Sequence, residues 1–297
     1  MPRKRGRALK LVRFSSGGEE GIGVLEGGSI LDFGHAGPQY RDWASAYEAA
    51  GSVERLVASL ERDKGKAGKL PYDYRTLRAP FSPSEIWAAG VTYFRSREAR
   101  ETETKTKGIY DYVYSAVRPE LFVKDSGLRC VGPGEEVCVR ADSKWSVPEP
   151  ELCVVLDASF RVVGYTAGND VSSRDIEGEN PLYLPQAKVY RGSSSFGPVV
   201  TTADDIPDPR SLRISLRVKR KSEVAFEGEV NTSQLKRSVE ELVGYLRRSN
   251  VIRTFTLLMT GTSIVPPDDF TLRGGDVVDI EIEGIGVLSN PVRQLEA

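Results

Sequence analysis

The feature that most constrains this chain is a pair of β-prone stretches joined by a short turn, with acidic residues at alternate positions. Residues 149–156 and 162–167 are mostly apolar and β-prone, and Asp157–Phe160 between them is typical of a turn. The pattern therefore predicts a β-hairpin in this part of the sequence.

The register of this hairpin decides where its acidic side chains point. With the turn centred on residues 158–159, we expect Glu151 opposite Thr166 and Glu149 opposite Gly168, with Asp170 two residues further on. Residues i and i+2 of a strand share a face, and so do directly opposed residues. All three carboxylates should then point to one side, whereas a slip of one residue would send Asp170 to the other.

Three carboxylates on one face predict a site for a hard cation. Glu149, Glu151 and Asp170 repel one another unless a positive charge lies between them, and residues 147–160 contain no Lys or Arg. Three oxygen donors completed by water are typical of Mg²⁺, with Mn²⁺ or Ca²⁺ as substitutes. The alternative interpretation is an ordinary strand with one solvated polar face.

Composition favours a turn-rich β protein and excludes some functions. The chain has 297 residues, of which 39% are hydrophobic and 29 are glycine, and its net charge is −1. This charge gives no electrostatic basis for binding nucleic acid or an anionic membrane. Three scattered cysteines, a basic start without an apolar signal region, and the lack of a long apolar run predict a cytoplasmic protein.

The sequence divides into two unequal parts. Residues 1–80 combine short strand-like pieces with helical patterns and are expected to form a small N-terminal α/β domain. A charged, glycine-containing segment at 62–69 is expected to be a linker. Residues 81–297 are expected to form the larger domain, which carries the acidic hairpin.

Two segments of the larger part have clear helical or strand signals. Residues 231–249 carry an apolar stripe at helical spacing and predict an amphipathic helix, with Thr232 or Ser233 as its N-cap. Residues 276–288 alternate between apolar and acidic side chains, which predicts a strand with one buried face. The highly charged stretch 94–107 is expected to be either a solvated surface helix or a mobile lid.

Several motifs, in order along about 210 residues, resemble the fumarylacetoacetate hydrolase family. The family's metal-binding E-x-E pattern is matched by Glu149 and Glu151, and its GYxxxNDxSxRD motif by residues 164–175. Its active-site lysine is matched by Lys188, its TGT segment by residues 260–262, and its terminal motif by residues 276–290. The resemblance implies an α+β, mainly β fold, a mixed β-sandwich roll, and a homo-oligomer, either a tetramer or a dimer.

Longer strings resemble one branch of this family, the sugar-acid dehydratases of pentose catabolism. They are YDYVYSAVRPELFVK, RCVGPGE, WSVPEPELCVVLD and ENPLYLPQAKVY. The resemblance implies a Mg²⁺-dependent hydro-lyase that converts a 2-keto-3-deoxypentonate, derived from D-arabinonate, to 2,5-dioxopentanoate. The configuration at C4 is not fixed by the sequence.

The segment 90–98 departs from the wider family. The family's C–C hydrolases have a His here, which pairs with a Glu and activates the attacking water, whereas this segment holds none and the one His of the chain is His35. Without a base that is neutral near pH 7, hydrolysis loses its usual water activator, but elimination does not need one. Acylpyruvate hydrolysis, oxaloacetate decarboxylation and dienoate isomerisation remain alternative activities, and a non-catalytic sugar-acid binder is a further one.

The resemblance also implies roles for individual residues. Lys188 is expected to remove the C3 proton, because burial near a cation lowers the pKa of a lysine. Glu120 is expected to protonate the leaving C4 hydroxyl, and Lys124 either stabilises the enolate, bridges to an acid, or has a structural role. Substrate contacts are expected from Thr262 and, across the lid, from Arg95 and Arg97.

Overall fold

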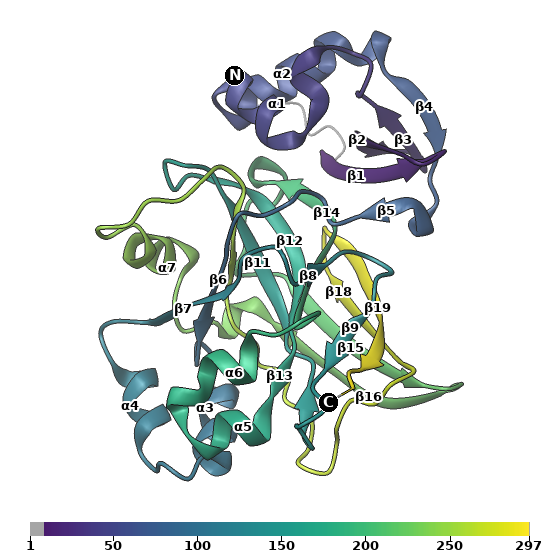
Figure 1. Cartoon of the computed structure of the whole chain (residues 1–297). Coiled ribbons are helices and arrows are strands. Elements are labelled where there is room, and N and C mark those ends of the chain that lie inside the picture. Colours follow the sequence, from purple (N-terminus) through teal and green to yellow (C-terminus); the bar gives the residue numbers. More distant parts are fainter. Residues whose placement is uncertain (1–8, 297) are drawn as a thin grey trace.

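Two β-sheets packed face to face form the main body of the protein. The computed structural model describes residues 9–296 (Figure 1). Within that range a twelve-stranded sheet runs in the order β4-β3-β2-β1-β14-β12-β11-β17-β6-β7, with β5 and β8 paired at its side, and a five-stranded sheet runs β16-β15-β18-β19-β9. The expected mainly β fold of mixed sandwich type is confirmed.

The N-terminal residues form a small unit of strands and two helices at one end of the molecule (Figure 1). Its elements are β1 (Lys10–Ser16), β2 (Glu19–Glu26), β3 (Ser29–Asp32), α1 (Trp43–Ala50), α2 (Val53–Asp63), β4 (Gly68–Pro71) and β5 (Leu77–Arg78). Strand β1 also pairs with β14 of the body, Leu11 lying opposite Val200. The N-terminal strands thus continue the large sheet, and a domain boundary at residue 80 stays a prediction.

The segment 62–69 is not the linker that its composition predicts. It contains the end of α2, a 3-10 turn over Lys64–Lys66 and the start of β4, which pairs with β3. The cause is the buried Asp63, whose carboxylate accepts hydrogen bonds from Tyr40 at 2.9 Å and from Lys66 at 2.8 Å. The basic residues 1–8, on which part of the expectation of a cytoplasmic protein rests, lie outside the described residues.

The body contributes the remaining strands and five helices. The strands of the large sheet here are β6 (Ile86–Gly90), β7 (Glu120–Asp125), β8 (Cys130–Val131), β11 (Pro150–Leu156), β12 (Val162–Asp170), β14 (Ser194–Thr202) and β17 (Thr256–Met259). Those of the smaller sheet are β9 (Val137–Val139), β15 (Arg213–Arg220), β16 (Glu223–Asn231), β18 (Asp276–Ile282) and β19 (Gly286–Gln294). A short pair, β10 (Ser146–Val147) and β13 (Ser172–Ser173), lies apart from both sheets. The helices are α3 (Phe94–Glu103), α4 (Ile109–Ser115), α5 (Arg174–Glu179), α6 (Leu184–Lys188) and α7 (Val239–Leu246).

The acidic hairpin is β11–β12, and its register differs by two residues from the expected one. Glu151 lies opposite Gly168 rather than Thr166, and the amide of Asp170 donates to the carbonyl of Glu149 at 3.0 Å. The connection is longer than a two-residue turn, since residues 157–161 form it with Phe160 in the left-handed region at φ 63°. An irregularity at 155–156 lies just before it. A shift of two preserves which face each side chain takes, so the shared face of the three acids is confirmed.

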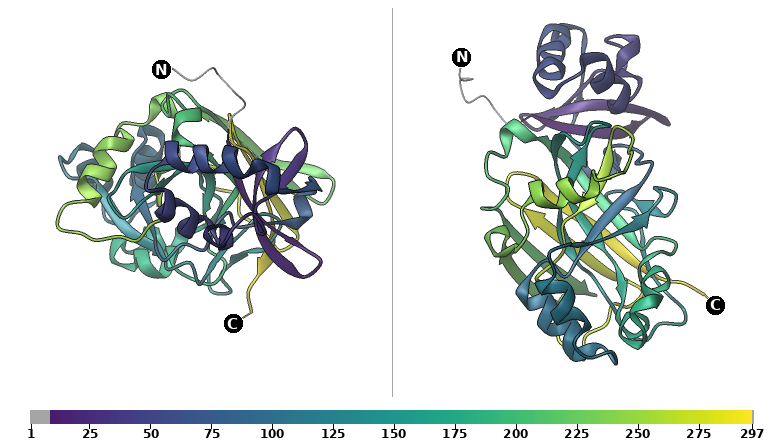
Figure 2. Two further views of the ribbon diagram at one scale, coloured as in Figure 1. Left: turned by 90° about the horizontal axis from the view of Figure 1, so that it is seen from above. Right: turned by 90° about the vertical axis from the view of Figure 1, so that its left-hand side faces the viewer.

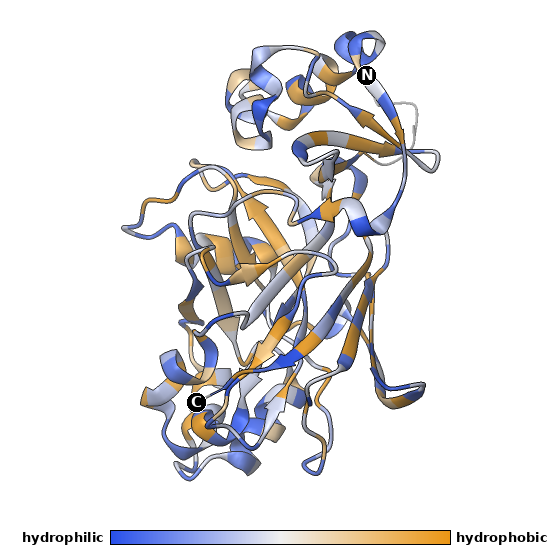
Figure 3. Ribbon diagram, turned by 45° about the vertical axis from the view of Figure 1, so that its right-hand side comes forward, coloured by the Kyte–Doolittle hydropathy of each residue, from blue (hydrophilic) through white to orange (hydrophobic). Residues whose placement is uncertain are grey.

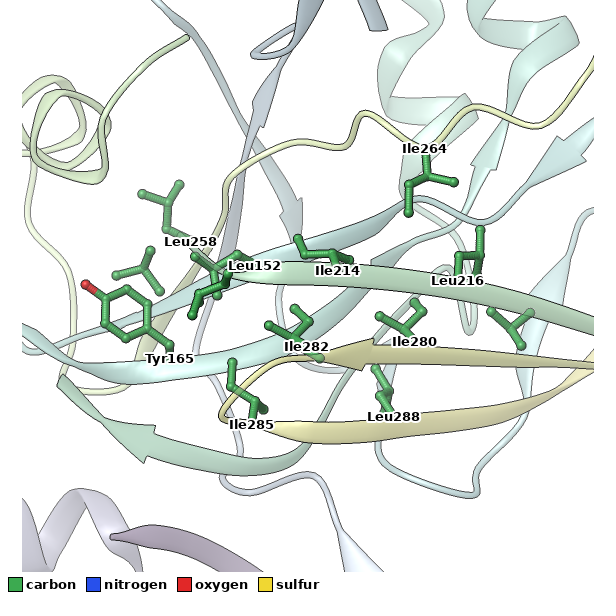
Figure 4. Packing of buried hydrophobic residues seen from close by; sticks show 14 of the residues in the cluster. Leu152, Tyr165, Ile214, Leu216, Leu258, Ile264, Ile280, Ile282, Ile285 and Leu288 are labelled. Carbon is green, nitrogen blue, oxygen red and sulfur yellow. The ribbon is translucent and has the colours of Figure 1, made fainter. Parts of the chain in front are cut away.

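The two faces of β11 pack against different groups of side chains. Leu152 and Leu258 of the large sheet pack against Ile280 and Ile282 of the smaller sheet, and these side chains form the core between the sheets (Figure 4). Each such fully buried aliphatic side chain stabilises the fold by about 1.5–3 kcal/mol. In Figure 3 hydrophobic colour gathers along several central strands, while the outer strands are banded and the loops and helices carry much of the hydrophilic colour.

The other face of the large sheet differs in polarity along its length. Toward the N-terminal unit it is apolar, because Cys153 and Val155 belong to a second core with Leu11 and Trp43. Helices α3, α4, α5 and α6 gather at the opposite end of the molecule (Figures 1 and 2). Among residues 9–296, no helix has the length and apolar character needed to cross a membrane.

The amphipathic helix starts later than expected. Its stripe of Leu235, Val239, Leu242, Val243 and Leu246 is buried, but residues 232–234 form a separate 3-10 turn and α7 begins at Val239. The cap is Ser238, whose hydroxyl accepts from the amide of Glu241 at 3.1 Å. Thr232 and Ser233 as caps were therefore wrong predictions.

Replacement of this cap gives a direct test of the helix start. We expect Ser238→Ala to reduce the free energy of unfolding by about 1 kcal/mol, because one helical amide loses its acceptor. Ser233→Ala, at an exposed position outside the helix, should change it by less than about 0.5 kcal/mol. Denaturant unfolding of the two variants measures the difference, and equal effects would contradict this helix start.

Candidate active site

The three predicted metal ligands meet in one buried cluster. Glu149 precedes β11, Glu151 lies on it and Asp170 ends β12, so the hairpin alone brings them together. One carboxylate oxygen of each lies within 4.8 Å of those of the other two, and all three residues are buried. Gly168 keeps this face open, because a Cβ there would lie 2.3 Å from the Cys153 Sγ.

Positive side chains from other elements surround two of these acids. Lys188 Nζ lies 2.7 Å from Glu149 Oε2 and 3.1 Å from Asp170 Oδ2. Burial would raise the pKa of Glu149, but Lys188 and Arg100 outweigh it and hold the pKa at about 2. Lys124 Nζ lies 2.8 Å from Asp170 Oδ1.

Glu151 is compensated differently. Within residues 9–296 it forms no ion pair, and its Oε2 accepts a 2.6 Å hydrogen bond from the amide of Gly261. Burial, together with the charges of Asp170 and Glu149, raises the pKa of Glu151 well above its usual value. A buried carboxylate with two like charges beside it and no cation of its own is what a bound divalent ion would stabilise. The donor set therefore fits the predicted Mg²⁺ site.

The TGT loop positions Glu151. Gly261 has a φ of +94°, a conformation that favours glycine, and a Cβ there would lie 1.9 Å from the Thr92 hydroxyl oxygen. That hydroxyl in turn donates to the carbonyl of Thr260 at 2.7 Å. The glycine thus lets the loop approach closely enough for its amide to reach the carboxylate.

A pocket opens on this cluster and contains several of the predicted site residues. It is lined by Ala89, Gly90, Val91, Ser96, Arg100, Glu120, Phe122, Glu149, Glu151, Asp170, Glu177, Leu184, Lys188, Gly261 and Thr262. The cavity measures about 20 Å³, little more than the space for one water molecule. Ser96 and Arg100 of α3 line this narrow space, which favours the lid interpretation of α3.

Lys188, the last residue of α6, pairs with two of the three acids. Burial alone would lower the pKa of Lys188, but Asp170 and Glu149 outweigh this effect and raise it. Its ammonium also donates to the Ser172 hydroxyl at 2.6 Å. The same carboxylates that would bind a cation thus also bind this ammonium, and the predicted lowering, which concerns the site with a cation bound, stays a prediction.

Glu120 faces the pocket from the start of β7. Desolvation in the pocket, with the charge of Glu177 nearby, raises the pKa of Glu120 to about 7, which suits a group that donates a proton near neutral pH. Gly90 lies directly opposite Glu120 in the β6–β7 pair. A Cβ at Gly90 would lie 2.1 Å from Glu120 Oε2, so the glycine leaves the space that this carboxylate occupies.

Lys124 lies behind the cluster rather than in the pocket. It is fully buried, and besides Asp170 its ammonium contacts the carbonyls of Lys188 and, at 3.3 Å, Val171. Burial lowers the pKa of Lys124 despite the Asp170 charge. Of the three roles considered for it, the geometry supports the bridge to an acid.

The two lid arginines do not reach the pocket. Arg95 is exposed, and Arg97 pairs with Asp111 at 2.9 Å with its guanidinium 4.4 Å from the Phe94 ring centroid. The face of α3 that turns inward carries Ser96 and Arg100, four residues apart, whereas 95 and 97 lie about 100° to either side of Ser96. Arg95 and Arg97 were expected to contact the substrate, and in the structure neither lines the pocket.

Sequence reasoning missed the roles of Arg100 and Glu177. The Arg100 guanidinium contacts Glu149 and lies 3.0 Å, through Nε, from Glu177 Oε1. Arg174 of α5 also reaches Glu149 at 3.3 Å and pairs with Glu103. The helical spacing of 96 and 100 in the lid was the available signal for Arg100, while nothing in the sequence indicated that Glu177 turns inward.

With this geometry established, comparison with known proteins identifies the class. The model of the fumarylacetoacetate hydrolase C-terminal domain matches residues 85–293, and the chain belongs to the fumarylacetoacetate hydrolase family. Among its relatives, a protein of Haloferax volcanii named probable 2-keto-3-deoxyxylonate dehydratase is 51% identical over 241 residues, which cover 81% of this chain and 83% of that protein.

Two further relatives carry related names. The 2-dehydro-3-deoxy-D-arabinonate dehydratase of Saccharolobus solfataricus is 49% identical over 222 residues, covering 73% of this chain and 74% of that protein. A solved structure of 2-keto-3-deoxy-D-arabinonate dehydratase, complexed with magnesium and 2,5-dioxopentanoate, has a TM-score of 0.81 at 38% identity and covers 97% of this chain and 100% of that chain. The predicted subfamily of sugar-acid dehydratases is thus confirmed.

Removal of one charge from the acid cluster tests the cation site without an activity assay. A cation at a hundred times its Kd stabilises the folded state by about 2.7 kcal/mol, so Mg²⁺ or Mn²⁺ should raise the melting temperature of the wild type. Glu151→Gln, which keeps the shape but loses the charge, should abolish that rise. The exposed Glu281→Gln should retain it, and an undiminished rise in Glu151→Gln would contradict the assignment.

Proposed function

We propose that this protein is a divalent-cation-dependent hydro-lyase that removes water from a 2-keto-3-deoxypentonate and yields 2,5-dioxopentanoate. The observation that carries the proposal is the pocket itself, which joins the buried acid cluster to Lys188 and Glu120 and contains no imidazole among its lining residues in the described part of the chain. Relatives about half identical to this chain are named as dehydratases of such acids.

Glu149, Glu151 and Asp170 would hold the cation. Mg²⁺ is the ion of choice for three carboxylates completed by water, and Mn²⁺ or Ca²⁺ are substitutes. The ion supplies Lewis acidity, which stabilises the negative charge that develops on the keto oxygen of the substrate. The related dehydratase structure contains magnesium together with 2,5-dioxopentanoate.

Lys188 is proposed to remove the C3 proton. Its Nζ is within 3.1 Å of two of the three ligands, so it lies beside the keto acid end of any substrate held there. As a base it must be neutral, and a second positive charge on the same carboxylates favours loss of its proton. Lys188 pairs with Glu149 and Asp170 as an ammonium, whereas the base must be a neutral amine. The two functions therefore require different charge states of Lys188.

Glu120 is proposed to protonate the C4 hydroxyl as it leaves. Its pKa of about 7 keeps a large part of its carboxyl groups protonated near neutral pH. Thr262 accepts a 3.3 Å hydrogen bond from the amide of Ile264 through its hydroxyl oxygen, which leaves the hydroxyl proton for the substrate carboxylate. Lys124 supports Asp170 from behind.

The substrate names of the two relatives describe the same kind of molecule. Formation of a 2-keto-3-deoxy acid removes the stereocentres at C2 and C3, and only C4 remains. D-Arabinonate and D-xylonate share their configuration at C4, because this carbon defines the D series of pentoses. We therefore propose one D-series acid as the substrate. Its rate of dehydration is to be compared with that of the L-series acid, which has the opposite configuration at C4.

Other aspects of the proposal concern the protein in its cell. A cytoplasmic location is proposed from the scattered cysteines and the absence of a long apolar run in the sequence. A role in pentose catabolism and a homo-oligomer, tetramer or dimer, are proposed from the resemblance to the sugar-acid dehydratases. An N-terminal domain of residues 1–80 beside a catalytic domain of residues 81–297 is part of the same proposal. The family match to residues 85–293 supports a catalytic unit of that extent.

The reaction itself is tested with purified protein. With Mg²⁺, a D-series 2-keto-3-deoxypentonate should lose one water and give an aldehyde, and excess chelator should stop the reaction. Acetylpyruvate cleavage should be slower by about 10²–10⁴-fold than in a hydrolase, since the pocket lacks the imidazole base. Efficient acetylpyruvate cleavage without aldehyde from either C4 epimer would show a different family activity.

The two proton-transfer residues should separate in a deuterium exchange experiment. Abstraction at C3 needs only the base and the cation, whereas expulsion of the hydroxyl also needs the acid. Glu120→Gln should lose about 10²–10⁴-fold in dehydration but still exchange C3 protons with deuterated water, while Lys188→Ala should lose both. NMR of the substrate reports both processes, and the reverse pattern would exchange the two roles.

The wild-type pH profile gives a second measure of the acid. Glu120 donates only when protonated, and its folded-state pKa is about 7, so dehydration should fall as the pH rises through about 7. Exchange at C3 should not fall over the same range, because its base becomes more available. Parallel decreases of both rates would contradict Glu120 as the acid.

A further inference from the structure

Glu177 places a second carboxylate in the pocket that the proposed roles do not use. It lies on α5, is 4% exposed and lines the same pocket as Glu120 and Lys188. Its Oε1 lies 3.0 Å from Arg100 Nε, while its Oε2 is buried and forms no hydrogen bond within residues 9–296. A buried carboxylate oxygen without a partner is costly, so this oxygen is positioned to meet a group of the substrate.

The proposed reaction requires a proton transfer that neither Lys188 nor Glu120 has been assigned. Loss of the C3 proton and the C4 hydroxyl gives 5-hydroxy-2-oxopent-3-enoate, which is not yet the product. To become 2,5-dioxopentanoate, this compound must lose one hydrogen from C5 and one from the C5 hydroxyl, and gain one each at C3 and C4. A base is therefore needed at C5, the end of the substrate away from the keto acid group.

The contacts of Arg100 separate Glu177 from the keto acid end. One guanidinium nitrogen of Arg100 contacts the metal ligand Glu149, and another contacts Glu177. Lys188, by contrast, touches Glu149 directly at 2.7 Å. The Arg100 guanidinium thus lies between Glu177 and the metal ligand Glu149. Lys188 lines the same pocket but contacts that ligand directly.

Glu120 and Glu177 also differ in their surroundings. Glu177 is paired with an arginine, which stabilises a carboxylate, whereas no ion pair within the described residues holds Glu120. The charge of Glu177 is moreover one cause of the raised pKa of Glu120, so the two groups lie close enough to interact. The pocket therefore holds two carboxyl groups in different surroundings, and that of Glu177 presents an oxygen without a hydrogen-bond partner in the described residues.

We propose that Glu177 is the catalytic base of the second stage, which removes a C5 proton from the elimination product. This inference rests on the proposed function. As the C5–H bond breaks, its electron pair forms the C4–C5 double bond, the C3–C4 pair moves to C2–C3, and the charge reaches the keto oxygen. Protonation at C3 restores the ketone, and the C5 enol then takes a proton at C4 and loses its hydroxyl proton to become the aldehyde.

The experiment follows both stages in Glu177→Gln by acid-quenched single turnover and NMR. We expect C3 exchange at a rate close to wild type, and loss of water that slows far less than aldehyde formation, which falls by about 10²–10⁴-fold. The vinyl protons of 5-hydroxy-2-oxopent-3-enoate should accumulate. Glu179→Gln, at an exposed position on the same helix, is the matched control and should form aldehyde like the wild type.

Two results would overturn the inference. The first is aldehyde formation by Glu177→Gln at the wild-type rate without accumulation of the unsaturated acid. The second is loss of C3 exchange together with dehydration, since that places Glu177 in the first stage or in the support of the site. If the wild type itself fails to dehydrate the acid, the proposed function fails instead, and the two failures are distinguishable.

A second variant keeps the test valid if the glutamine variant does not fold. Glu177→Asp retains the charge that pairs with Arg100 but withdraws the oxygen from the substrate. It should slow aldehyde formation more than loss of water, and substrate deuterated at C5 should show an isotope effect on aldehyde formation alone. Equal slowing of both stages would contradict a base at C5.

Discussion

The burial of three like charges on one face of a hairpin is the constraint around which the rest of the site is arranged. Two of the acids, Glu149 and Asp170, are held by cationic side chains from β7, α3, α5 and α6. The carboxylate of the third, Glu151, is held by the amide of Gly261 alone among the described residues. Buried charges persist only when paired or bound to metal, so these helices are tied to the sheet by electrostatics as well as by packing.

The hairpin was predictable because its side chains follow the simplest periodicity in proteins. Strand parity fixed the faces of Glu149, Glu151 and Asp170, and this result survived an error of two residues in register. The error arose in the connection, where Asp157 accepts the amides of Ser159 and Arg161 and stabilises a five-residue loop. Side-chain hydrogen bonds of this kind leave no clear trace in a hydropathy pattern.

Contacts across long sequence distances were not predictable in the same way. Arg100 lies 49 residues from Glu149, and their contact depends on the rotation of α3 about its own axis. Composition identified the lid as rich in arginine but not which arginine faces inward, so Arg95 and Arg97 were expected at the pocket in place of Arg100. Family resemblance supplied Lys188 and Glu120, whereas Glu177 emerged only when the elements were assembled.

The pairing of Gly90 with Glu120 has a consequence for how this enzyme can evolve. The carboxylate fills the space where a side chain at position 90 would begin, and it is the flexible end of its side chain that would give way. Substitution of Gly90 would therefore displace the Glu120 carboxylate without changing residue 120 itself. We therefore expect positions 90 and 120 to change together in evolution, because a side chain at the first determines where the carboxylate of the second can lie.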